Sequence, residues 1–153
     1  MFAKHRLHNR RSVLKLGLMA WFAGILPRPA WADWNKPAFE SKTLSDAYKA
    51  LGVESIVESS DVQIIASDIA ENGAVVPVQG ISKLSNTQSI TFLVEKNPNM
   101  LAAVFEISPE MAPDISTRIK MGQTSNVIVL VKADGRYFTA SKEIKVTLGG
   151  CGG

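Results

Sequence analysis

The sequence predicts an all-β fold, an immunoglobulin-like antiparallel β-sandwich of about seven short strands. From residue 61 onward, apolar residues recur at every second position, which is the period of a half-buried strand. These runs follow one another at a spacing of about 8–12 residues, and turn signals such as Asn72-Gly73, Asn97-Pro98 and Asp134-Gly135 lie between them. No strand–helix–strand alternation and no glycine-rich nucleotide loop competes with this interpretation.

Ahead of the strands, the apolar residues of 44–51 have helical spacing, and Gly52 suits the position after a helix end. We therefore expect a short N-terminal helix over 44–51. The segment 33–43 is polar and lacks a clear period, so we expect it to be an arm or lead-in.

The first strand is expected near 61–69, followed by a hairpin turn at 71–73 and a strand over 74–78. Pro77 cannot donate to a ladder, which predicts that this strand lies at an edge or carries a bulge. Further strands are expected over 90–95 and 101–107. One face of the latter is formed by Leu101, Ala103, Phe105 and Ile107.

The run 115–121 alternates cleanly between apolar and polar residues. The run 127–131 is apolar on both faces, which predicts a central strand. Asp134-Gly135 then forms a hairpin into 136–140, and a last strand over 144–148 leads into the C-terminal glycines.

The N-terminus has the features of a twin-arginine signal peptide over residues 1–32. Arg10 and Arg11 precede a short apolar run, and the small-x-small site 30–32 predicts cleavage after Ala32. An amphipathic N-terminal helix is the alternative. Export by this route predicts a periplasmic protein with no membrane segment after cleavage.

Removal of the signal changes the charge of the protein. Residues 1–32 hold six of the 17 Lys and Arg and none of the 14 acidic residues, so 11 basic groups remain against 14 and the net charge becomes −3. The basic character of the full chain therefore gives no reason to expect nucleic-acid binding.

Both histidines, His5 and His8, also lie in the signal, and Cys151 is the only cysteine. The mature chain therefore has no Ser-His or Cys-His relay and lacks the usual ligands of zinc, copper and haem. We expect no catalytic residues, no bound metal and no cofactor, and thus a protein that is not an enzyme. One cysteine also excludes an internal disulfide.

The C-terminus, residues 149–153, reads Gly-Gly-Cys-Gly-Gly and predicts a flexible arm after a β-sandwich domain spanning 33–148. Gly149, Gly150, Gly152 and Gly153 flank the thiol of Cys151. A thin arm of this kind suits a covalent carrier that presents a substrate to other enzymes. Nothing nearby in the sequence lowers the thiol pKa, so we expect the partner enzymes to activate it.

Three other interpretations of the tail remain. Cys151 is a terminal residue without a role, or it joins two chains by an intermolecular disulfide in a structural or binding sandwich. In the third, Gly152-Gly153 carries a thiocarboxylate, as in ubiquitin-like sulfur carriers. The export signal argues against that interpretation because it places the tail where ATP is absent.

The two ends of the chain together resemble the SoxY family, the sulfur carriers of the periplasmic thiosulfate-oxidising Sox system. The Gly-Gly-Cys-Gly-Gly tail is the specific motif, and the internal stretches 71–78, 94–98, 116–125 and 146–148 agree with it. The resemblance covers essentially the whole mature chain and implies an immunoglobulin-like fold.

The resemblance also implies partners. These are a small β-sandwich subunit, SoxZ, as a heterodimer, a haem-containing enzyme that couples thiosulfate to Cys151 as S-thiosulfonate, and a metal-dependent hydrolase that releases sulfate. A sulfur dehydrogenase that oxidises the remaining cysteine persulfide is present in some such systems. We further expect that the choice of the twin-arginine route reflects co-export of a bound partner.

Overall fold

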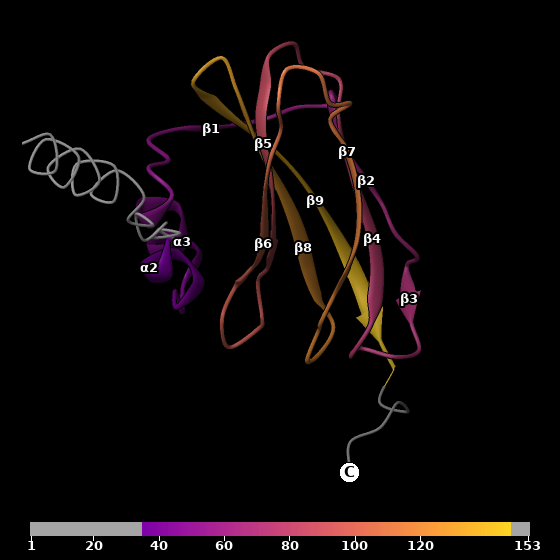
Figure 1. Cartoon of the computed structure of the whole chain (residues 1–153). Helices are drawn as coiled ribbons and strands as arrows, with labels where there is room; N and C mark the ends of the chain where they lie inside the picture. Colours follow the sequence, from indigo (N-terminus) through magenta and orange to yellow (C-terminus); the bar gives the residue numbers. More distant parts are fainter. Residues whose placement is uncertain (1–34, 148–153) are drawn as a thin grey trace, which may run out of the picture. The chain divides into compact units, whose positions relative to one another are not determined.

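The computed structural model describes residues 35–147, which form two short helices and nine strands (Figure 1). The helices are α2 (Lys36–Phe39) and α3 (Leu44–Ala50). The strands are β1 (Ile56–Glu58), β2 (Val62–Ile65), β3 (Ile69–Ala70), β4 (Val76–Ser82), β5 (Thr87–Val94), β6 (Leu101–Glu106), β7 (Asp114–Ile119), β8 (Ser125–Ala133) and β9 (Arg136–Val146).

The strands form two sheets. The larger has the order β1-β9-β8-β5-β6 with β3 also paired to β9, and the smaller has the order β2-β4-β7. All pairs are antiparallel except β1 and β3, which run parallel to β9. The predicted β-sandwich with a short N-terminal helix is confirmed. The strand count exceeds seven because β1 and β3 have three and two residues, too few to show a period.

The core fills the space between the two sheets. Its largest buried side chains include Phe92, Ile90 and Met121, and Val127, Val129 and Val131 contribute alternate residues of β8. A second apolar cluster covers the other face of the larger sheet, where Ile128 and Leu130 pack with α2 and α3. The prediction that 127–131 is a central strand is confirmed, because β8 lies in the middle of its sheet and is buried on both faces.

The expectation of an unstructured lead-in over 33–43 is wrong for its described part. Asn35 caps α2 by accepting from the Ala38 N–H (3.2 Å), and Pro37 lies in the first turn, where a missing N–H costs nothing. Ala38 and Ser41 are buried. Four residues give no helical period, so only packing against α3 and the sheet reveals this helix.

Residues 71–73 do not make the predicted hairpin. β3, before the turn, pairs with β9 in the larger sheet, whereas β4, after it, pairs with β2 and β7 in the smaller one. The turn therefore carries the chain from one layer to the other. A local Asn-Gly signal marks a turn but does not specify which strands it joins.

Pro77 lies in a central strand and not at an edge, because β4 is flanked by β2 and β7. The register explains how it is tolerated. Pro77 pairs with Arg118 on β7, but the pairing with β2 begins only at Gln79. The strand thus has a single neighbour at the proline, and an edge-like position exists within a central strand.

Leu101 does not share a face with Phe105 as predicted. The register between β5 and β6 shifts between Phe92 and Leu93, so that Ala102 is an extra residue. Leu101 consequently packs under the helices, while Phe105 packs between the sheets. The two strands expected over 136–140 and 144–148 are one strand, β9, whose pairing with β8 continues from Arg136 to Ile144.

Gly80 provides a test of the inter-sheet packing. A Cβ there would lie 2.9 Å from Phe92 Cζ and 3.3 Å from Ile90 Cγ2. We expect Gly80→Ala to lower the free energy of unfolding by about 1–3 kcal/mol through overpacking. In the double variant with Phe92→Leu, which removes the contacting ring atoms, the loss should be smaller than the sum of the single losses. Urea denaturation measures all four proteins. Simple additivity would contradict the contact.

Candidate functional site at the base of the C-terminal arm

The predicted site residues lie outside the described residues. This applies to Cys151 and to Gly149, Gly150, Gly152 and Gly153, and equally to Arg10, Arg11 and the cleavage site after Ala32. The structure does describe the point from which the tail departs. β9 ends at Val146, and Thr147, the last described residue, is four residues from Cys151. Four extended residues span at most about 13–14 Å.

The end of β9 is bonded on two sides. Toward β3, the Lys145 N–H donates to the Asp68 carbonyl (2.8 Å) and the Thr147 N–H donates to the Ala70 carbonyl (3.1 Å). The intervening Val146 N–H donates to Thr124 Oγ1 (3.0 Å). Successive backbone groups of a strand point in opposite directions, so these bonds restrain the strand from both edges. The backbone is therefore held up to Thr147, two residues before the glycine-rich tail begins.

Gly73 packs against this anchor. A Cβ on Gly73 would lie 2.4 Å from the Met121 carbonyl oxygen and 2.9 Å from Val146 Cγ1. The Gly73 carbonyl in turn accepts from the Met121 N–H (2.7 Å). Asn72 fixes the turn because its Oδ1 accepts from the Ala74 N–H (2.9 Å). No side chain fits at Gly73 without displacing backbone, so the turn that crosses between the layers also supports the end of β9.

An ion pair ties β3 to the same strand. Lys142 Nζ lies 2.9 Å from Asp68 Oδ1 and also donates to the Ala66 carbonyl. The hydrogen bond and the charge of Lys142, with a smaller contribution from Lys145, hold the pKa of Asp68 below its ordinary value. The pair is exposed on the Asp68 side, so its contribution to stability is modest.

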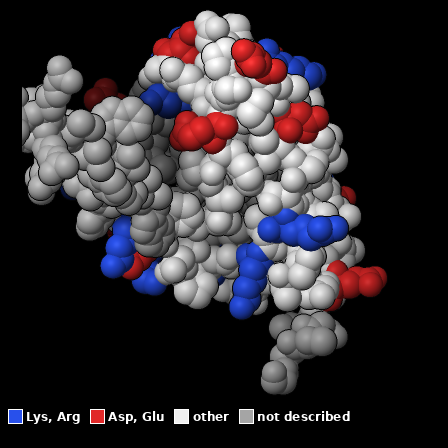
Figure 2. Space-filling model, in the orientation of Figure 1, with Lys and Arg blue, Asp and Glu red and all other residues white. Residues whose placement is uncertain are grey.

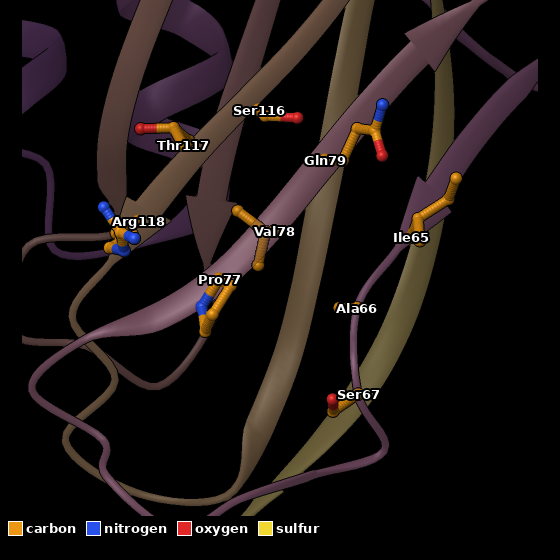
Figure 3. Close-up of a pocket in the computed structure, with 9 residues that line it drawn as sticks. All are labelled: Ile65, Ala66, Ser67, Pro77, Val78, Gln79, Ser116, Thr117 and Arg118. Atoms are coloured by element: carbon orange, nitrogen blue, oxygen red, sulfur yellow. The ribbon is translucent and has the colours of Figure 1, made fainter.

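Two hollows are open on the surface of the described part. One, of about 870 Å³, lies on the smaller sheet and is shown in Figure 3; it is lined by Ile65, Ala66, Ser67, Pro77, Val78, Gln79, Ser116, Thr117 and Arg118. Arg118 is its only charged side chain. The second, of about 620 Å³, lies beside α3 around Tyr48 and Lys49.

The described residues contain no group of three or more potential metal ligands. They also contain no helix long and apolar enough to cross a membrane. Around the end of β9, the described contacts are backbone hydrogen bonds, a close glycine contact and one ion pair.

Comparison with known proteins identifies the family. The family model described as "Sulfur oxidation protein SoxY" matches residues 47–151, which ends on Cys151. The chain belongs to the SoxY family. The solved structure of the sulfur carrier protein SoxY from Chlorobium limicola f thiosulfatophilum is similar at 37% identity and a TM-score of 0.63, covering 69% of this chain and 97% of that one. The resemblance seen in the sequence is confirmed.

A second solved structure shares the fold alone. The superoxide reductase (neelaredoxin) from Ignicoccus hospitalis matches with 13% identity and a TM-score of 0.53, over 60% of this chain and 94% of that one. No curated protein matched the chain. The sandwich is thus a scaffold shared with an unrelated activity, and function must be argued from the tail and its base.

Sequence reasoning did not identify the residues that hold the base of the tail, namely Asp68, Gly73, Thr124 and Lys142. Their partners lie 22 to 76 residues away in the chain. In the sequence, the Asn72-Gly73 pair indicates only a turn. The close contact of Gly73 with Met121 and Val146 depends on how the two sheets are placed against each other, which no local sequence pattern predicts.

We expect Gly73→Ala to loosen the end of β9. The added Cβ must displace either the Met121 carbonyl or Val146, and overpacking of this kind costs about 1–3 kcal/mol. Amide hydrogen exchange should be faster at Lys145, Val146 and Thr147 than in the wild type. Gly122→Ala is the matched control, because its Cβ would meet nothing closer than Asn97 Oδ1 at 3.9 Å. Equal exchange in both variants would contradict the support role.

The Asp68–Lys142 pair predicts a pH dependence of stability. The pKa of Asp68 is lower in the folded state than in the unfolded state. The ionised carboxylate therefore stabilises the fold above the unfolded-state pKa of about 3.9, and this stabilisation is lost as pH falls through the folded-state pKa. Wild type should therefore be more stable than Asp68→Asn at pH 7, and the two should converge in acid. Urea denaturation between pH 7 and pH 2.5 measures this. A constant difference would show that the charge of Asp68 is irrelevant.

Proposed function

We propose that Cys151 is the covalent attachment point of a sulfur carrier in the Sox system. The SoxY family to which the chain belongs consists of sulfur carriers of thiosulfate oxidation. The observation that carries the assignment to Cys151 is that the family match extends through the tail to this one cysteine. The firmly bonded end of β9 supports it, because a carrier arm requires a fixed base.

The chemistry assigned to the thiol is a stepwise exchange. Oxidative coupling joins the Cys151 sulfur to the sulfane sulfur of thiosulfate, forms an S–S bond and releases a proton and two electrons. Those electrons pass to the haem of the coupling enzyme. Hydrolysis of the resulting S-thiosulfonate by water then gives sulfate, a proton and a cysteine persulfide. The persulfide sulfur is oxidised further where a sulfur dehydrogenase is present.

In this proposal the chain is not itself an enzyme. The mature sequence contains no histidine and one cysteine, so it has no imidazole base to activate the thiol. The haem coupling enzyme, the metal-dependent hydrolase and the SoxZ-like β-sandwich subunit supply reactivity and docking. The twin-arginine signal places the mature protein in the periplasm, and the SoxZ-like subunit is exported with it.

The alternative is a structural or binding sandwich whose Cys151 only forms an intermolecular disulfide. Both proposals require an accessible thiol, and they differ in what is attached to it. The carrier bears sulfur intermediates on Cys151 during turnover, whereas the disulfide protein bears a second copy of itself.

Intact mass of the protein from thiosulfate-grown cells separates the two. We expect adducts of a single sulfur atom or of a thiosulfonate group, localised to the C-terminal peptide and removed by thiol reductant. The Cys151→Ser variant should carry no adduct and should not support thiosulfate oxidation. Thr147→Ser, at the last described residue, is the control and should behave as wild type. Isolation of only free thiol and a disulfide homodimer would refute the carrier.

A further inference from the structure

The ladder between β8 and β9 ends before β9 does. Its last pair is Ser125 with Ile144, and Ile144 is fully buried in the core. Residues 145–147 continue past this point at the end of β9 (Figure 1). These three residues therefore need partners other than the β8 backbone to stay extended.

On the side of β8, the partner is a side chain. β8 begins at Ser125, and the residue before it, Thr124, accepts a hydrogen bond at its Oγ1 from the Val146 N–H (3.0 Å). The hydroxyl of Thr124 thus continues the ladder by one bond where the backbone of β8 has ended. Val146 is half-buried, so its N–H would be costly to leave without a partner.

On the other side, the partner is β3, which is a weak restraint by itself. β3 has two residues, pairs only with β9, and leaves Ile69 55% exposed. The Asp68 side chain, which pairs with Lys142, is 86% exposed, and exposed ion pairs contribute little. Figure 2 shows both acidic and basic side chains near this end of the described chain, so no field of one sign holds the strand there.

We propose that Thr124 is a positioning residue for the thiol of Cys151. Its hydroxyl bonds the edge of β9 opposite β3, and the two restraints together keep residues 145–147 extended. The free chain then begins after Thr147 and not after Ile144. This inference deepens the proposed carrier function and rests on it, because it assigns to one hydroxyl the point from which the carrier arm starts.

The starting point decides where the thiol can go. From Thr147 the four residues to Cys151 span at most about 13–14 Å, whereas from Ile144 seven residues span about 23–25 Å. Thr139 lies eight strand residues before Thr147, about 26 Å away, but only five residues before Ile144, about 16–17 Å away. Thr124 therefore keeps the thiol at the end of the sandwich and away from its sides.

A second cysteine on the side of the sandwich tests this role. Glu58 is exposed on β1, and its backbone pairs with Thr139. A disulfide adds at most about 7 Å between Cα atoms, so an arm that starts at Thr147 cannot reach Glu58→Cys, whereas an arm that starts at Ile144 can. In a glutathione redox buffer, the equilibrium fraction of intramolecular disulfide gives the effective concentration of the two thiols. Intact mass separates this product from disulfide dimers.

We expect little intramolecular disulfide in the full chain with Glu58→Cys alone. Adding Thr124→Val, which has the same shape without the hydroxyl, should raise the effective concentration by about tenfold or more, because it leaves the Val146 N–H without its partner. Adding Thr124→Ser, which keeps the hydroxyl, should leave the value near that of the parent.

Two controls separate positioning from general loss of stability. Glu71→Cys lies next to Ala70, whose carbonyl accepts from the Thr147 N–H, so it is within reach of Cys151 from either starting point. Its effective concentration should change by less than about twofold with Thr124→Val. Thr87→Val removes a hydroxyl that donates to the Leu84 carbonyl (3.0 Å), at the end of the sandwich where β9 begins, and should not raise the disulfide at Glu58→Cys.

Three results would overturn the proposal. They are an unchanged effective concentration at Glu58→Cys with Thr124→Val, an equal rise with Thr124→Ser or with Thr87→Val, and a parent chain that cross-links as readily at Glu58→Cys as at Glu71→Cys. The measurement uses the isolated protein without any sulfur substrate. Its failure therefore leaves the carrier assignment standing, and that assignment is decided separately by the adducts on Cys151.

Discussion

The pairing of β9 is the constraint on which the rest of the structure depends. Over 11 residues it supplies the ladder partner of β8 along its length, of β1 near its start and of β3 near its end. β1 and β3 are too short to persist alone and exist because β9 offers them a fixed edge. The same strand contributes Ile144 to the inter-sheet core, where it is fully buried. The backbone that leads to the tail is therefore among the most strongly connected in the described part of the chain.

Much of the fold was predictable from period and turn signals. The alternation in 115–121 and the double-sided apolar run in 127–131 each describe a strand whose burial follows from local sequence. The α3 helix was likewise visible, because Leu44, Ala47 and Leu51 share a face. In each of these elements the apolar pattern by itself indicates which faces are buried, so that local pattern and tertiary packing agree.

The errors occur where a non-local contact decides. α2 and β3 exist through packing and pairing that a few residues cannot specify. One extra residue at Ala102 places Leu101 on the opposite face from Phe105, and the register between β2 and β4 makes Pro77 acceptable in a central strand. The same distinction between local pattern and non-local contact applies to the candidate site. The cysteine and its glycines are conspicuous in the sequence, whereas the contacts of Gly73 and Thr124 with Val146 at the end of β9 join distant segments.

The hydrogen-bonded end of β9 also sets the local concentration of the Cys151 thiol. A thiol four residues beyond Thr147 is confined to within about 13–14 Å of a fixed point. For an enzyme docked with its active-site mouth inside that radius, tethering gives the thiol an effective concentration in the millimolar range or above, whatever the protein concentration in the compartment. Outside that radius the effective concentration is zero. Because the hydrogen bonds at Lys145, Val146 and Thr147 fix the start of the tail, the length of the tail decides which docked enzymes the thiol can reach.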